Sequence, residues 1–303
     1  MKLLVFGAGF SGRAIARHLV ADGAQAWGTT RAEEKFDALG AEGMEPVLFE
    51  GEATDAVRAA LRDATHIVQS IAPPRDGPQA RETVPPPPDI VTDPVLEAFG
   101  AQPLSDLAPR LEWVGYLSTV GVYGDHGGAW VDEDTPAAPT SARSRQRVRA
   151  EAEWLAIAQA TGLPVCVARL SGIYGPGRNA LRKALAGEGR RLVKKDQVFN
   201  RIHVEDIAAA LARFARERRD GIVNVTDDEP APPQDVVLFA HDLVGREAPP
   251  PIDFETADLT PMARSFYGEN KRVSNARSKD WGHEYRFPDY RAALTEMWER
   301  ERY

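Results

Sequence analysis

The 303-residue sequence predicts an α/β fold in which a parallel sheet carries helices on both faces. Short apolar runs recur along the chain, segments with helical spacing separate them, and a glycine-rich turn joins the first run to the first helix. Alternation of this kind is typical of a doubly wound sheet. With 43% hydrophobic and 27% charged residues, the chain has enough apolar side chains for one large core and an attached smaller lobe.

Six apolar runs predict the strands of this sheet. They span 2–6, 26–29, 46–49, 66–71, 113–117 and 165–170. Helical spacing predicts helices over 13–19, 55–61, 145–161 and 204–214. The proline-rich stretch 84–89 predicts a turn-rich insert, because proline donates no backbone hydrogen bond to a sheet.

A glycine-rich turn follows the first predicted strand and opens the first helix. Its spacing fits G-x-G-x-x-G, and its residues are Gly7-Ala8-Gly9-Phe10-Ser11-Gly12. In such a turn the first glycine permits the tight bend, the second lets the backbone approach a pyrophosphate, and the third lets the helix pack against the strand. The helix N-terminus adds amide donors and a partial positive charge. We therefore expect a Rossmann-type dinucleotide site here, with Phe10 and Ser11 taking part.

The end of the second strand bears on the choice of dinucleotide. NAD binding usually places an acidic residue there, but the sequence reads Gly28-Thr29-Thr30-Arg31. Because a guanidinium suits a 2'-phosphate, Thr30 and Arg31 favour NADP. Glu33 and Glu34 lie close by and could bind the ribose hydroxyls of NAD, so NAD remains the alternative cofactor. Ser70 and Ala72, after the fourth strand, are expected to line the cofactor channel.

Four further stretches occur in the order found in one enzyme family. They are Ser118-Thr119-Val120-Gly121-Val122-Tyr123-Gly124, Arg169 to Arg178 with Tyr174-Gly175-Pro176-Gly177, Arg201-Ile202-His203-Val204-Glu205-Asp206-Ile207, and Gly221-Ile222-Val223-Asn224-Val225. With the glycine turn, they resemble the extended short-chain dehydrogenases, also called the NAD-dependent epimerase/dehydratase family, over nearly the whole chain. The resemblance implies that Thr119 hydrogen-bonds a substrate oxygen.

The sequence departs from this family at its catalytic Y-x-x-x-K pair. If Glu151-Ala152-Glu153 is the acidic run that follows the pair, the tyrosine and lysine positions fall on Arg145 and Arg149. Arginine stays protonated at neutral pH, so it cannot replace a tyrosine in proton transfer. Tyr123, Tyr174 and His203 are the candidate substitutes, and a chain of water molecules is another proton source.

Basic residues and His203 are candidates for substrate contacts. Arg149 could orient an anionic substrate, and Arg178 and His203 are placed with the substrate as well. Two functions stay open. The first is an NAD(P)-dependent oxidoreductase or epimerase acting on a small or sugar-like carbonyl or hydroxyl substrate. The second is a catalytically inactive dinucleotide-binding redox sensor or scaffold.

The expected domain division follows the strand pattern. Residues 1–170 form the dinucleotide-binding Rossmann domain, to which 197–226 return, and residues 171–196 and 227–303 form a smaller C-terminal substrate lobe.

Composition limits the other classes of function. A net charge of −8 and a pI near 5.4 argue against a nucleic-acid surface. The sequence has no run of 18 apolar residues and no signal peptide, and its single Cys166 allows no intramolecular disulfide, so we expect a cytoplasmic protein away from membranes. No histidine spacing suggests a metal site. The expected partners are a small-molecule substrate and, in a homodimer, a second copy.

Overall fold

The computed structural model describes residues 1–74 and 91–303, and the insert expected at 84–89 lies outside them. Contacts divide the chain into two compact units. Unit 1 contains 1–122, 139–169 and 207–223, and unit 2 contains 123–138, 170–206 and 224–303. The sequence-based boundaries group 123–138 and 197–206 with the first domain. The contacts group them with unit 2, because their short strands pair with strands of that unit.

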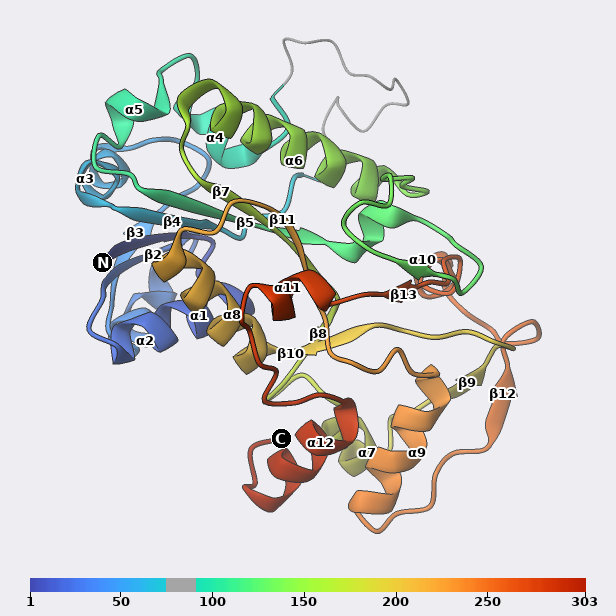
Figure 1. Ribbon diagram of the computed structural model, residues 1–303. Coiled ribbons are helices and arrows are strands. Elements are labelled where there is room, and N and C mark those ends of the chain that lie inside the picture. Colours follow the sequence, from blue (N-terminus) through green and yellow to red (C-terminus); the bar gives the residue numbers. More distant parts are fainter. Residues whose placement is uncertain (75–90) are drawn as a thin grey trace. The chain divides into compact units, whose positions relative to one another are not determined.

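Unit 1 is built on a seven-stranded parallel sheet (Figure 1). Its order is β11-β7-β5-β4-β1-β2-β3, and the strands are β1 (Lys2–Phe6), β2 (Gln25–Thr30), β3 (Met44–Leu48), β4 (His66–Gln69), β5 (Trp113–Thr119), β7 (Val165–Leu170) and β11 (Gly221–Val225). The α/β fold class and all six expected strands are confirmed. The count of six is corrected to seven, because β11 extends the sheet beside β7.

Helices cover both faces of this sheet, as Figure 1 shows. On one face lie α3 (Asp55–Asp63), α4 (Pro94–Phe99), α5 (Leu104–Leu107) and α6 (Ala142–Thr161). On the other lie α1 (Phe10–Ala21), α2 (Phe36–Gly40) and α8 (Val204–Glu217), while the short 3₁₀ turns η1 (Glu33–Lys35) and η3 (Val120–Tyr123) follow β2 and β5. Side chains of Thr54, Asp93 and Ser141 accept backbone N–H groups at the starts of α3, α4 and α6.

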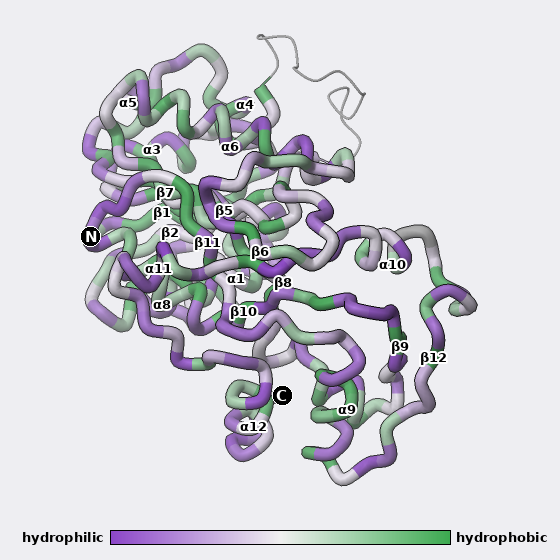
Figure 2. The backbone as a smooth tube through the Cα atoms, turned by 45° about the vertical axis from the view of Figure 1, so that its right-hand side comes forward, coloured by the Kyte–Doolittle hydropathy of each residue, from purple (hydrophilic) through white to green (hydrophobic). Residues whose placement is uncertain are grey.

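The central strands carry apolar side chains toward both layers of helices. Every residue of β4 and β7 is buried, so these strands do not alternate between apolar and polar residues, and their buried polar side chains, such as Gln69 and Arg169, form hydrogen bonds. In Figure 2, hydrophobic green segments gather around β5 and β7. The core between the sheet and α3 to α6 includes Phe6, Tyr116 and Trp154.

The connection into β11 is fixed to the sheet by three polar contacts. His66 Nε2 lies 3.2 Å from the carbonyl oxygen of Ala215, and Trp113 Nε1 donates to that of Arg219 at 2.9 Å. The backbone N–H of Val165 donates to the carboxylate of Asp220 at 3.1 Å. The last strand to appear in the sequence is therefore tied to β4, β5 and β7.

Unit 2 combines three small two-stranded sheets with short helices. Its strands pair as β6 (Trp130–Val131) with β13 (Arg272–Val273), β8 (Gly172–Tyr174) with β10 (Arg201–His203), and β9 (Arg191–Val193) with β12 (Pro251–Asp253). Its helices are α7 (Ala180–Ala186), α9 (Pro233–Leu243), α10 (Pro261–Ser265), α11 (Ala276–Asp280) and α12 (Tyr290–Glu299). Leu181, Phe287 and Leu294 belong to its core. In the described part of the chain, no helix is long and apolar enough to cross a membrane.

Candidate functional site

The glycine turn in unit 1 is held by Thr29, near the end of β2. The backbone N–H of Gly7 donates to Thr29 Oγ1 at 2.8 Å, and that of Ala8 donates to the carbonyl oxygen of Thr29 at 2.9 Å. Gly7 has φ +80°, a left-handed conformation that favours glycine. The buried Thr29 therefore fixes the turn from the neighbouring strand.

Gly9 and Gly12 differ in what a side chain would meet. A Cβ on Gly12 would lie 2.6 Å from the carbonyl oxygen of Gly7 and 2.9 Å from Val5 Cγ1, so this glycine lets α1 pack against β1. A Cβ on Gly9 would meet only the Gly7 carbonyl oxygen, at 4.0 Å, and the φ of Gly9 is −90°, which any residue adopts. Nothing in the surrounding protein therefore requires a glycine at position 9, whereas a ligand approaching the backbone does.

The start of α1 suits an anionic group. Its first helical hydrogen bond runs from the N–H of Arg13 to the carbonyl oxygen of Gly9, at 2.9 Å, so the amides of Ser11 and Gly12 have no acceptor within the helix. The N-cap has no side-chain hydrogen bond and the first turn has no acidic residue. Together with the space beside Gly9, these features fit the pyrophosphate of a dinucleotide.

The end of β2 carries the residues expected to select the dinucleotide. Thr30 Oγ1 accepts the N–H of Ala32 at 3.3 Å, which shapes the turn. Arg31 is exposed and forms neither an ion pair nor a hydrogen bond with any described residue. Glu33 and Glu34 are exposed in η1, so both carboxylates face solvent.

The segment after β4 lies against the glycine turn. A Cβ on Gly7 would lie 2.8 Å from Ile71 Cγ1 and 3.4 Å from the carbonyl carbon of Ser70. The buried Gln69 positions this segment, because its Oε1 accepts the N–H of Ile71 at 2.8 Å and its Nε2 donates to Asp93 at 2.7 Å. Ser70 thus borders the turn, and Ala72 follows in an exposed position.

A buried ion pair sets the rotational position of α6 against the sheet. Arg169 in β7 donates to Glu151 Oε2 at 2.7 Å, and Ser118 in β5 donates to Glu151 Oε1. At about 100° per residue, Arg145 and Arg149 lie about 120° and 160° around the helix from Glu151, toward the face away from the sheet. The substrate contact expected of Arg149 stays a prediction.

Arg147, one turn before Glu151, occupies the sheet side of α6. Its Nη1 donates to the carbonyl oxygen of Leu117 at 2.7 Å and to Tyr116 Oη at 3.1 Å. Burial raises the pKa of the Tyr116 phenol well above its usual range. The Arg147 guanidinium therefore binds the end of β5 and fixes the backbone near Thr119.

Thr119 lies beside a second hydroxyl that the sequence analysis missed. The Oγ1 of Thr119 accepts the N–H of Gly121 at 3.1 Å. The point where a Cβ on Gly121 would sit lies 3.5 Å from Thr119 Oγ1 and 3.1 Å from the Oγ of Ser144, in the first turn of α6. A side chain at position 121 would crowd Ser144, so this glycine lets the turn after β5 pack against the start of α6. The sequence signal was a serine three residues after the N-cap Ser141, ahead of the acidic run.

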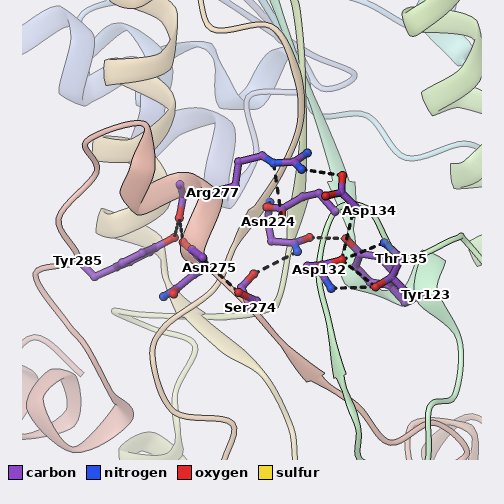
Figure 3. A network of polar contacts seen from close by, with 12 residues as sticks. Tyr123, Asp132, Asp134, Thr135, Asn224, Ser274, Asn275, Arg277 and Tyr285 are labelled. Carbon is purple, nitrogen blue, oxygen red and sulfur yellow. Dashed lines mark hydrogen bonds and ion pairs between the residues drawn. The ribbon is translucent and has the colours of Figure 1, made fainter.

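Tyr123, a candidate proton donor, belongs to unit 2 and is fully buried. Its Oη donates to Asn224 Oδ1 at 2.8 Å, while the backbone N–H of Asn224 donates to Glu133 Oε1 at 2.7 Å. Figure 3 shows Tyr123 and Asn224 in a network that also reaches Arg277 and Asp134. This hydroxyl stabilises the interior of unit 2.

Tyr174 and His203 pack together in unit 2. Their ring centroids are 5.3 Å apart, and His203 also packs against Phe287 at 4.3 Å. The Tyr174 Oη and the His203 Nε2 are buried and have no hydrogen-bond partner among the described residues. Burial raises the pKa of Tyr174 above its usual range and, with the nearby Arg286, lowers that of His203 to about 4. Both side chains are therefore neutral at pH 7. Arg178 is exposed, and its backbone forms a short antiparallel bridge with Gly175.

Comparisons with known proteins identify the family. The pattern of the NAD dependent epimerase/dehydratase family matches residues 3–226. The chain belongs to this family. The match spans the glycine turn, β5, α6 and β11, and the resemblance inferred from the sequence is confirmed.

Similar proteins cover this chain almost end to end. A solved structure described as a functionally unknown conserved protein from Silicibacter pomeroyi is 45% identical, with a TM-score of 0.85 over 100% of this chain and 99% of that one. Protein YeeZ of Escherichia coli is 27% identical over 95% of this chain and 97% of its own length. The human epimerase family protein SDR39U1, solved with NADPH, is 21% identical with a TM-score of 0.72 over 99% of both chains, and shares the fold.

Metal ligands do not gather in the part of the chain that the structure describes. Within 1–74 and 91–303, no three His, Cys, Asp or Glu side chains are grouped so that they could hold a metal ion.

Proposed function

We propose that this protein is an NAD(P)-dependent oxidoreductase or epimerase that acts on a small or sugar-like carbonyl or hydroxyl substrate. The observation that carries the proposal is the space beside Gly9, at a φ that would accept any residue. Family membership supports the same reading. A nicotinamide dinucleotide supplies hydride chemistry when bound, and the protein's task is to bind, orient and exchange a proton with the substrate.

Each part of the dinucleotide would meet a defined group of unit 1. The turn and the first amides of α1 would hold the pyrophosphate, and Ser70 would border the channel. We propose NADP as the preferred form, because the exposed guanidinium of Arg31 is available for a 2'-phosphate. Thr119 would donate to the reacting oxygen, since its Oγ1 already accepts the N–H of Gly121 and its own hydrogen remains to be donated.

The proposal includes a small-molecule substrate in a reducing, cytoplasmic setting. It excludes nucleic acid as a partner because the net charge is −8. A homodimer is the assembly we propose on the family resemblance alone.

Calorimetric titration with NADPH, NADP, NADH and NAD, followed by a panel of carbonyl compounds, tests the proposal. We expect tighter binding of the phosphorylated forms and loss of NADPH absorbance with at least one carbonyl. Binding without loss of NADPH absorbance would overturn the oxidoreductase, and if no sugar-like substrate is epimerised either, the result would favour a redox sensor or scaffold. Absence of binding would overturn the dinucleotide site itself.

A further inference from the structure

A surface hollow of about 510 Å³ lies in unit 2, beside the helix α9. This volume is within the range of about 300–1,000 Å³ that is typical of small-molecule sites. The residues that line the hollow come from α9, from the segment that follows it and from the start of α12 (Figure 1). All of them belong to unit 2, so one compact unit forms the whole hollow.

One face of α9 brings two carboxylates to this hollow, with apolar side chains between them. Asp235 and Asp242 are seven residues apart, so two turns of the helix place them on the same face. Leu238 and Phe239, three and four residues after Asp235, share that face and also line the hollow. At 1.5 Å per residue, the two aspartates lie about 10 Å apart along the helix axis. The hollow therefore has an acidic group at each end of an apolar strip.

The fold of unit 2 makes no use of these two carboxylates. Neither Asp235 nor Asp242 forms an ion pair or a side-chain hydrogen bond with any residue that the structure describes. Asp242 lies in the last turn of α9, where the partial negative charge of the helix end disfavours a carboxylate. A cation bound to Asp242 would relieve this repulsion.

The two arginines of the hollow already contact the protein. Arg291 forms an ion pair with Glu229 and lies over the ring of Tyr290, 4.4 Å from its centroid. Arg246 Nη1 lies 3.5 Å from the carbonyl oxygen of Ala184. The carboxylates are thus the charges left for a ligand, and they favour a cationic one.

Tyr290 adds an unused acceptor to the same hollow. The residue is 2% exposed, packs against Phe239 at 5.8 Å between ring centroids, and forms no hydrogen bond through its hydroxyl with a described residue. Buried hydroxyls usually have a hydrogen-bond partner. Because a phenol oxygen can accept as well as donate, it can take an N–H of a bound ammonium.

We propose that this hollow binds a linear aliphatic diamine. One ammonium pairs with Asp235 and the other with Asp242, while the methylene chain covers Leu238 and Phe239. An ammonium has only donors, which matches a site whose unused groups are acceptors. The site belongs to unit 2 and is independent of the dinucleotide turn in unit 1 and of the proposed reaction.

Calorimetric titration of the full chain with hexamethylenediamine tests the proposal, at low ionic strength because salt screens exposed charges. Hexylamine is the control ligand, since it has a chain of the same length and a single ammonium. We expect the diamine to bind about fivefold more tightly, the effect of one additional exposed ion pair. Equal affinities for the two compounds would overturn a site with two acidic ends.

Two variants separate this site from general attraction to a chain of net charge −8. Asp242→Asn removes one end of the site and should weaken diamine binding to about the affinity of hexylamine. Glu247→Gln removes an exposed carboxylate close by that does not line the hollow, so the diamine Kd should stay within twofold of wild type. Equal losses in both variants would mean that only general attraction acts, and the proposal would fail.

The last arms of the test address the nature and the position of the ligand. Arg246→Ala removes a cation that repels a diamine, so affinity should stay equal or rise. Aminocaproate has a carboxylate at one end, and tighter binding of it than of the diamine would overturn the diamine in favour of a zwitterion. Nuclear Overhauser contacts should join the diamine methylenes to Leu238 and Phe239. If the saturated complex lacks them, the diamine does not lie in this hollow.

Discussion

Thr119 and Tyr123 are four residues apart in the sequence, and their hydroxyls have opposite surroundings. In unit 1, Thr119 is half-buried, and its Oγ1 accepts the backbone N–H of Gly121. In unit 2, Tyr123 is fully buried and bonded to Asn224, and Tyr174 and His203 are packed ring against ring. The difference teaches that a polar side chain is a candidate for catalysis only where the fold leaves it accessible to a ligand. A reactive residue type inside a motif does not by itself mark a site.

The largest expected effect is on the free energy of unfolding, and it concerns His203. If its ring belongs to a closed core, its pKa of about 4 in the folded state lies below the usual 6.5, so the unfolded chain binds a proton first as the pH falls. The stabilisation is complete above about pH 6.5 and is lost toward pH 4, by about 3 kcal/mol. The free energy of unfolding of wild type minus that of His203→Phe, measured by urea unfolding, should therefore increase as the pH rises from about 4 to 6.5.

The comparison with a variant is needed because Asp206 titrates in the same window. Burial raises the pKa of Asp206 to about 6, so its contribution has the opposite sign and falls as the pH rises from about 3.8 to 6. The difference between wild type and His203→Phe isolates the histidine. Parallel curves for the two proteins would show that His203 is accessible to protons in the folded state.

Gly9→Val tests the glycine turn of unit 1 as the binding site of the pyrophosphate. The added side chain enters the space proposed for the pyrophosphate while meeting no protein atom closer than 4.0 Å at its Cβ. We expect dinucleotide affinity to fall by about 100-fold or more, which is about 2.7 kcal/mol, with an unchanged urea midpoint. Gly12→Val is the matched contrast, because its Cβ would clash with Gly7 and Val5 and lower stability as well. Full affinity in Gly9→Val would remove the pyrophosphate from this turn.

Arg31→Asp sharpens the comparison within the open site. The substitution removes a cation that no described residue engages and places a carboxylate where a 2'-phosphate would lie. We expect the ratio of NADP to NAD affinity to fall by about tenfold, or about 1.4 kcal/mol, in calorimetric titrations. Equal losses for both dinucleotides would mean that Arg31 does not read the phosphate.

The smallest expected effects distinguish two tyrosines of unit 2 whose hydroxyls are buried. Tyr123→Phe leaves Asn224 Oδ1 without its donor and should lower the free energy of unfolding by about 1 kcal/mol. Tyr174→Phe removes a hydroxyl that has no partner among the described residues, so stability should stay the same or rise. Neither should change kcat for the best carbonyl. A large loss of turnover in either variant would return that tyrosine to the reaction.

The glycine turn and the sheet could be predicted because local rules decide them. The spacing predicts a bend at Gly7, an open approach to the backbone at Gly9 and close packing of helix on strand at Gly12. The structure has all three. The strands could be found because residues buried on both faces of a sheet are mostly apolar. The edge strand β11 was recognised as a motif but left out of the strand count, since its place in the sheet depends on pairing with β7.

The side chains around the reacting oxygen depend on long-range contacts that no local pattern encodes. The sequence of α6 offers Arg145, Arg147 and Arg149 in alternation, and which of them faces the sheet is set by the pairing of Glu151 with Arg169. Ser144 was missed for the same reason. Its nearness to Thr119 follows from that rotation of the helix and from the missing side chain at Gly121.

The position of β11 has a consequence for the growing chain during synthesis. Until residues 221–225 have been made, β7 is the outermost strand on that side, with six buried residues and an open row of backbone donors and acceptors. Such an edge pairs readily with other chains. A ribosome-bound fragment ending after β7 is therefore exposed to aggregation for as long as translation of the next fifty or so residues takes. The buried strand β7 gains its second neighbour only when β11, the last strand of the sheet in the sequence, has been made.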